Sequence, residues 1–179
     1  MVSPLRVSGL VLATALLGAC NHGGDHSRTT SVSRHLSIAD NGDVIAYARD
    51  GSTARISVAG DLEIAGKPVT VSSAGRKRLQ GYRSDALALR HDAIATGKAG
   101  VQTGLHALDA VAKGLASGDT DSIDSEVNSR AGKVDALAHT VCQDLARLYA
   151  DQGQVTAAIP AFRPYATIVR HEVSDCHTD

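Results

Sequence analysis

Hydrophobic and polar residues alternate between residues 35 and 71 in short runs that glycine-containing turns separate. The runs are Leu36/Ile38, Val44 to Ala48, Ile56/Val58, Leu62/Ile64 and Val69/Val71, and the turns are Asn41-Gly42, Asp50-Gly51, Gly60-Asp61 and Gly66-Lys67. Glycine, asparagine and aspartate tolerate the positive φ that tight hairpin turns require. The pattern predicts an antiparallel β-meander over residues 35–71 with one apolar face, which another element must cover.

The hydrophobic spacing becomes helical over residues 73–117, where Ser72 or Ser73 can cap the helix. One apolar stripe recurs every seven residues: Leu87, Ile94, Val101, Leu108 and Leu115. Beside it runs a stripe of small residues: Ala93, Gly97, Gly100, Gly104, Ala107, Val111 and Gly114. Four glycines inside a helix cost roughly 3–4 kcal/mol relative to alanine, so we expect another helix backbone to pack against the groove they form.

A second helix is expected from Asp121 or Ser122 to Gly153, with Val127, Val134, Val141 and Leu148 at heptad spacing. The short connection makes the two helices antiparallel, and we expect this second helix to be the one that packs against the groove of small residues. In the segment 154–179 prolines interrupt regular structure, Thr167-Ile168-Val169 is a candidate last strand or turn, and Phe162 and Tyr165 are expected to fasten the segment to the hairpin. The predicted fold is α+β: a meander (35–71) packed against a long helical hairpin (73–153), with a short C-terminal segment (154–179).

The first twenty residues contain a basic residue, a short apolar run and a cysteine. Arg6 precedes an apolar run from Val7 to Leu17, which as a helix spans only about 16 Å and is too short to cross a bilayer. The run ends in Leu17-Gly18-Ala19-Cys20, in which a small pair precedes a cysteine, and this resembles the lipobox of bacterial lipoproteins. We expect a signal peptide over 1–19, acylation of Cys20 and a flexible polar tether over 20–34, leaving a single domain over 35–179. The alternative is an ordinary secretory signal with a chance cysteine.

Composition narrows the class of protein. Of 179 residues 43% are hydrophobic and 21% charged, which is an ordinary globular balance. Aromatic residues make up 3% and the formal net charge is −1, so neither stacking platforms nor a basic footprint for nucleic acid is present. Charges at Asp92, Lys98, Asp109 and Lys113 argue against a membrane-embedded dimerisation helix, although the small-residue stripe resembles that motif.

With Cys20 acylated, two cysteines remain, Cys142 and Cys176. In an oxidising compartment such a pair is most simply a disulfide, which closes a loop of about 35 residues. Two free thiols are the alternative.

The search for catalytic chemistry returns no nucleophile elbow, P-loop or dinucleotide fingerprint. Ser72, Ser73 and Ser84 lack the context of a triad. The carboxylates Asp119, Asp121, Asp124 and Glu126 cluster at a helix start, where the helix dipole favours them. We therefore expect no catalytic residues, no cofactor and no enzyme activity.

Two histidine-containing segments are candidate metal sites. The run from His171 to His177 resembles HExxH with Asp175 in place of the second histidine, and one helix face would hold His171 and Asp175. The run follows a β-branched segment, lies at a chain end and contains a cysteine expected in the disulfide. His22 and His26 belong to a polar tether. We expect no metal at either place.

One basic cluster stands out, Arg76-Lys77-Arg78 with Arg83. It could contact anionic headgroups or lipid phosphates near the anchor. The commoner meaning of such a cluster is a solvated helix start.

Further along the chain the residues carry a family likeness. The stretch from Gly60 to Val69, followed by Arg78, Leu79 and Tyr82, resembles the YggN-like family of bacterial periplasmic proteins. The glycine-rich helix, Cys142 with Leu145 and Leu148, and the segment IPAFRPYATI are similar to the later part of that family. The resemblance covers residues 35–176 and implies an exported Gram-negative envelope protein, without implying any chemistry. The lipobox is a departure, because family members carry a plain signal peptide.

These observations predict a non-enzymatic envelope lipoprotein that binds or scaffolds another envelope component. Its membrane contact is the lipid anchor, facing the periplasm. Asn21 replaces the aspartate of the inner-membrane retention signal, which favours the outer membrane. The alternative is a periplasmic binding protein that holds a small hydrophobic ligand between sheet and hairpin. The sequence does not set the oligomeric state.

Overall fold

The computed structural model describes residues 34–117 and 121–176. The side chains of all these residues are described except those of residues 114–126. Five strands come first: β1 Leu36–Ile38, β2 Val44–Tyr47, β3 Thr53–Ile56, β4 Leu62–Ile64 and β5 Lys67–Val69. Four helical elements follow: α2 Ser73–Ser117, α3 Asp121–Ala158, the 3-10 helix η1 Pro160–Tyr165, and α4 Arg170–Asp175. The predicted α+β fold, a sheet packed against a long helix pair with short C-terminal elements, is confirmed.

The sheet is an antiparallel meander in the order β1-β2-β3-β4-β5. The hairpin turns contain Gly42 and Gly60 at positive φ, as the turn pattern predicted. Glycine is required at position 60 for two reasons. Its φ is positive, and an added Cβ would lie 2.8 Å from the Arg76 carbonyl oxygen of α2. The expected run Ile56/Val58 was misplaced: β3 ends at Ile56, and Val58 follows it with 57% of its surface exposed.

The first long helix begins where the sequence predicted, because the Ser72 hydroxyl accepts a hydrogen bond from the Gly75 N–H at 3.1 Å. The predicted end of the second helix at Gly153 was wrong, since α3 continues to Ala158. Gln152 and Val155 are buried on either side of this glycine, and their packing outweighs the roughly 1 kcal/mol that glycine costs inside a helix. Helix α3 ends two residues before Pro160.

The C-terminal segment contains no strand in the described part of the chain, so the suggestion of a last strand at residues 167–169 was wrong. The chain there is a connection between η1 and α4. In the structure Cys142 of α3 and Cys176, directly after α4, are joined in a disulfide.

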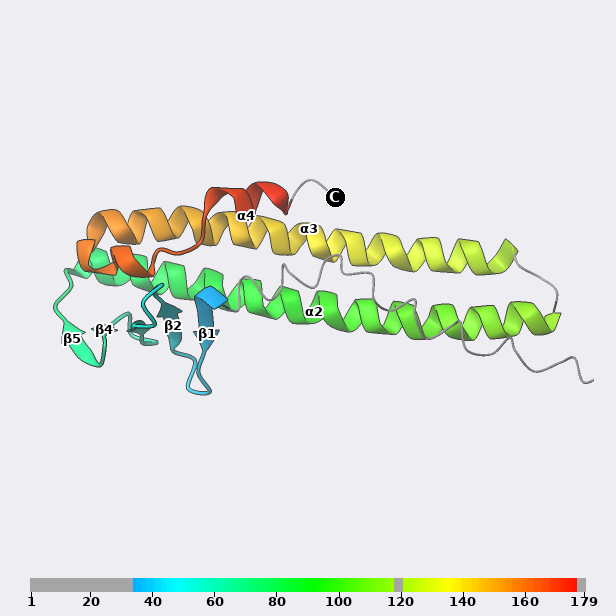
Figure 1. Cartoon of the computed structure of the whole chain (residues 1–179), viewed down its shortest axis with the longest axis horizontal. Coiled ribbons are helices and arrows are strands. Elements are labelled where there is room, and N and C mark those ends of the chain that lie inside the picture. The colour runs from blue at the N-terminus through cyan, green and yellow to red at the C-terminus, as the bar shows by residue number, and fades with distance from the viewer. Residues whose placement is uncertain (1–33, 118–120, 177–179) are drawn as a thin grey trace, which may run out of the picture.

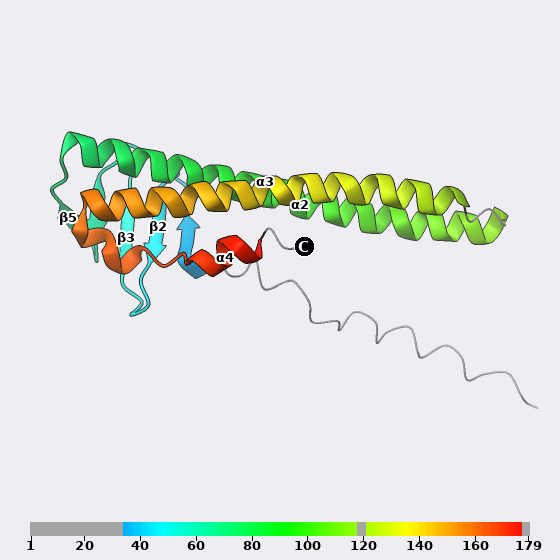
Figure 2. The same cartoon turned by 90° about the horizontal axis from the view of Figure 1, so that it is seen from above.

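The hydrophobic core lies where the sheet, the base of the hairpin and η1 meet. Phe162 of η1 is fully buried, and its ring packs edge-on against Tyr82 of α2 with centroids 5.6 Å apart. The ring of Tyr165 also packs against that of Phe162, with centroids 5.9 Å apart, which confirms that these late aromatics fasten the C-terminal segment. Figures 1 and 2 show that the sheet, η1 and α4 gather around one end of the helix pair, while the other end projects beyond them.

Tyr82 is fully buried, and its hydroxyl has no hydrogen-bond partner among the described residues. Burial raises the pKa of this phenol well above its ordinary value. We expect Tyr82→Phe to leave the free energy of unfolding unchanged or to raise it by up to about 1 kcal/mol, because an unpaired buried hydroxyl is removed while the ring contact remains. Urea unfolding measures this change, and a loss above about 1 kcal/mol would mean that the hydroxyl has a partner.

Candidate functional site

Large hydrophobic side chains lie exposed along the projecting half of α2. We call them the α2 apolar face: Ile94, Val101, Leu105, Leu108 and Val111. Their exposed fractions run from 46% at Ile94 to 71% at Leu108. Single exposed hydrophobic residues are ordinary on protein surfaces, whereas five at helical spacing on one element form a strip, which makes this face the candidate site.

The α2 apolar face continues the side of the helix that the sheet covers. Near its start, α2 touches the turns of the meander: the Gln80 amide donates to the Ala59 carbonyl at 2.9 Å, and Arg83 Nε donates to the Gly42 carbonyl at 2.8 Å. Arg83 and Val101 are eighteen residues apart, which is five full turns of helix, so they point in the same direction. The sheet therefore covers this side near the base of the hairpin and leaves it open beyond (Figure 1).

The glycine stripe does not face α3, and this expectation was wrong. An ideal Cβ built on Gly97, Gly100 or Gly104 would meet no atom within 4 Å. The half-buried residues of α2 between 94 and 110 are alanines and threonines, of which only Ala107 belongs to the stripe of small residues: Ala95, Thr96, Ala99, Thr103, Ala107 and Ala110. Alanine and threonine permit nearly as close an approach as glycine, so the seam between the two helices uses them, and the glycines border the α2 apolar face.

The hairpin seam also holds two layers of facing carboxylates, which sequence reasoning missed. Asp85 of α2 lies beside Asp151 of α3, and Asp92 lies at the level of Asp144. Asp144 is 1% exposed and pairs through Oδ1 with Arg147, while its Oδ2 has no hydrogen-bond partner among the described residues. The sequence contains a signal for this arrangement, because the two aspartates on each helix are seven residues apart. In an antiparallel hairpin, equal spacing on the two helices brings both pairs to the same level.

The surroundings of Asp85 and Asp92 shift the pKa values of these two groups in opposite directions. Burial, and next the negative charge of Asp151, raise the pKa of Asp85. A hydrogen bond to His91 Nδ1 at 2.8 Å is the main cause that lowers the pKa of Asp92, and Asp144 adds a smaller contribution. The pair at Asp85 therefore opposes folding at neutral pH, whereas the group at Asp92 does not.

We expect Asp85→Asn to raise the free energy of unfolding at pH 7 by roughly 0.5 kcal/mol, the scale of a solvent-screened charge interaction. The pKa of Asp85 is higher in the folded than in the unfolded state, so between these two pKa values the folded state holds more protons. The free energy of unfolding therefore falls as the pH rises from about 4 through the pKa of the folded state. Urea midpoints of the wild type and the variant, compared from pH 4 to 8, should therefore diverge with increasing pH.

Two control variants accompany that titration. Asp151→Asn should give a smaller effect in the same direction, because it removes the charge of Asp151 but leaves the burial of Asp85, which is the main cause of the raised pKa. Asp109→Asn should behave oppositely, since hydrogen bonding to Lys113 lowers the pKa of Asp109. Parallel curves for the wild type and Asp85→Asn would contradict the assignment.

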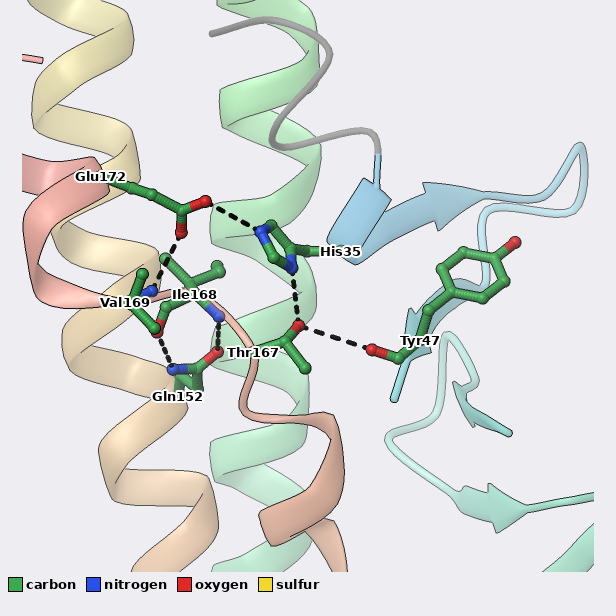
Figure 3. A network of polar contacts seen from close by, with 7 residues as sticks. All are labelled: His35, Tyr47, Gln152, Thr167, Ile168, Val169 and Glu172. Atoms are coloured by element: carbon green, nitrogen blue, oxygen red, sulfur yellow. Dashed lines mark hydrogen bonds and ion pairs between the residues drawn. The ribbon is translucent and has the colours of Figure 1, made fainter. Parts of the chain in front are cut away.

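A polar network fastens the C-terminal segment to the sheet (Figure 3). His35 bridges the two, with Nδ1 2.8 Å from the Thr167 hydroxyl and Nε2 3.0 Å from Glu172 Oε1. The other Glu172 oxygen accepts the Val169 N–H at 3.0 Å and so caps α4. The buried Gln152 amide bonds both the N–H and the carbonyl of Ile168. Each group holds a chain segment in place, which gives the network a structural role.

The HExxH-like run forms part of this anchoring. His171 and Asp175 are exposed on α4, Glu172 is engaged by His35, and Cys176 is in the disulfide. In residues 34–117 and 121–176, no three histidine, cysteine, aspartate or glutamate side chains gather as metal ligands. His22, His26, Cys20 and Asp119 lie outside the described residues, as do the side chains of Asp121, Asp124 and Glu126.

The basic cluster is largely engaged within the protein. Arg76 pairs with Asp61, Arg83 bonds the Gly42 carbonyl, and Arg78 donates to the Gln154 amide oxygen. Lys77 and Arg78 also line an open depression of about 400 Å³ between the two helices, opposite Asp151 and Gln154. This depression lies away from the predicted sheet–hairpin pocket, whose place Leu79, Tyr82, Leu148 and Phe162 fill.

No helix of the described residues is both long and apolar enough to cross a membrane. Ser84 is exposed, and Ser72 caps α2. Comparisons of the chain with family models, with curated proteins and with solved structures find no match.

Proposed function

We propose that the protein is a non-enzymatic lipoprotein of the bacterial cell envelope that binds or scaffolds an envelope component through the α2 apolar face. The observation that carries the proposal is the exposure of five large hydrophobic side chains on the part of the hairpin that projects beyond the sheet. Burying such a strip is worth roughly 25 cal/mol per Å² of apolar surface, so a partner that covers it gains affinity directly.

The sequence supports the envelope location. The lipobox ending at Cys20 supplies the anchor, and Asn21 favours the outer membrane. Fully extended, the residues from 21 to 34 reach about 50 Å, which lets the domain work at a distance from the membrane surface while it stays attached. The resemblance to the YggN-like family of periplasmic proteins points to the same compartment.

Site-specific photo-crosslinking in cells tests the proposal. A photoreactive residue replaces Leu108 on the α2 apolar face, and a matched variant carries it at Ala136, which is exposed on α3. We expect a discrete adduct from position 108 and none from position 136. A fatty-acid label on the wild type that is lost in Cys20→Ser tests the anchor in the same cells. No adduct at 108, or the same adducts at both positions, would overturn the binding role.

A further inference from the structure

We infer that the occupant of the α2 apolar face is a second copy of this chain, whose α2 runs antiparallel to the first. The inference rests on the proposed function and names the partner at that site. The two hairpins would then pack side by side through their projecting halves, with the two sheets at opposite ends of the assembly.

The shape of the uncovered strip fits a helix as its cover. From Ile94 to Val111 the strip extends about 26 Å along a straight helix. Its members Val101, Leu105 and Leu108 are spaced four and three residues apart, the spacing at which the side chains of one helix fit between those of another. The strip also prolongs the existing sheet–α2 interface, so a second copy would complete one continuous covered side.

The open glycines favour close helix packing at this place. Gly97, Gly100 and Gly104 border the strip, and each faces open space. Each weakens the isolated helix by roughly 1 kcal/mol relative to alanine, and no described residue packs over it in compensation. A neighbouring helix that approaches over these glycines would supply that contact.

The charges beside the strip select the antiparallel orientation. Lys98 and Asp109 lie on the same flank of the strip, eleven residues apart. In an antiparallel pair centred between Thr103 and Gly104, Lys98 of each copy lies level with Asp109 of the other, and Val101 lies between the levels of Leu105 and Leu108. A parallel pair in register would place the two copies of this flank on opposite sides of the seam, so neither Lys98 nor Asp109 would meet an opposite charge there.

The segment 21–34 is poorly suited to cover the strip. Residues 21–34 contain a single large aliphatic residue, Val32. A bilayer surface would leave the carboxylate of Asp109, which is exposed and paired with Lys113, against the headgroups. The antiparallel second copy uses both the apolar strip and its flanking charges.

Cysteine crosslinking of the full-length lipoprotein in cells tests the inference. In the centred antiparallel pair, the two copies of residue 105 are about 4.5 Å apart along the axis and the two copies of residue 94 about 28 Å. We expect a short bismaleimide to convert Leu105→Cys to a dimer in good yield and Ile94→Cys hardly at all, with Ala136→Cys as the matched control. Equal dimer yields at 105 and 94 would overturn the antiparallel geometry.

A charge swap supplies a second readout. In the Leu105→Cys background, Lys98→Asp should reduce the dimer yield at least several-fold, because it faces Asp109 of the other copy. The double variant Lys98→Asp/Asp109→Lys should restore it. A yield that does not respond to either variant would contradict the predicted pairing of charges.

The two proposals fail separately. If residue 105 forms no dimer while the photoreactive residue at 108 still captures a different protein, the second copy is excluded and the binding role stands. If the residue at 108 captures only phospholipid, the strip binds a membrane surface and the second copy is again excluded. If neither position captures anything, the binding role fails together with the inference.

Discussion

Replacing Phe162 by alanine is expected to lower the free energy of unfolding by about 3–5 kcal/mol, the usual loss when a buried aromatic ring is truncated. Phe162 is fully buried between Tyr82 and Tyr165, so the substitution leaves a cavity at the point where η1, α2 and the sheet meet. A large part of the net stability of a domain of this size would be lost. Urea unfolding followed by circular dichroism measures the change.

The matched control for Phe162→Ala is Ala161→Gly. Ala161 precedes Phe162 in η1 and is exposed, so its variant perturbs the same backbone without opening a cavity. We expect the control to cost at most about 1 kcal/mol. Similar losses for the two variants would show that η1 contributes through its backbone and that the ring packing is secondary.

The sequence predicted those parts of the fold that depend on local chemistry. The meander was recognised because each turn needs a residue at positive φ, and Gly42 and Gly60 supply it. The start of α2 was recognised because a serine hydroxyl can satisfy a free N–H, which Ser72 does. Such signals act over three or four residues, so they can be read from the chain without knowledge of tertiary contacts.

The parts that the sequence did not predict depend on contacts between distant segments. Two stripes of small residues run along α2, and composition could not tell which one faces α3; the threonine and alanine stripe does, and the glycine stripe is open. The prediction that the second helix ends at Gly153 was wrong for a similar reason. Burial of Gln152 and Val155 stabilises the helix beyond this glycine, although glycine has a low helix propensity. Packing thus overrides propensity where the two disagree.

The sequence predicted the apolar residues of the candidate site but not their exposure. The heptad series through Ile94, Val101 and Leu108 was recognised as the apolar side of an amphipathic helix, and such a side is ordinarily buried. The sheet is too short to cover it beyond the base of the hairpin, and only the structure reveals this (Figure 1). The exposure of the strip follows from the mismatch between a helix of 45 residues and a five-stranded sheet whose strands run across that helix (Figure 2).

Replacing both Cys142 and Cys176 by serine is expected to lower the free energy of unfolding by about 3–4 kcal/mol, the chain-entropy value for a closed loop of about 35 residues. The disulfide lowers the conformational entropy of the unfolded chain. The loop that it closes contains the C-terminal part of α3 and all of η1 and α4. Urea unfolding of the oxidised wild type and the double variant, both without reductant, measures the loss.

Hydrogen exchange of the double variant separates an effect on the unfolded chain from local tethering of α4. His35 still bonds Thr167 and Glu172, and Gln152 still holds both polar groups of Ile168, so the folded C-terminal segment keeps its position without the disulfide. The amides of α4 should therefore lose protection only in proportion to global stability. If the amides of α4 exchange at the rate of an unfolded chain while those of the core stay protected, the disulfide holds α4 against the rest of the fold. The polar network alone is then too weak to hold the C-terminal segment.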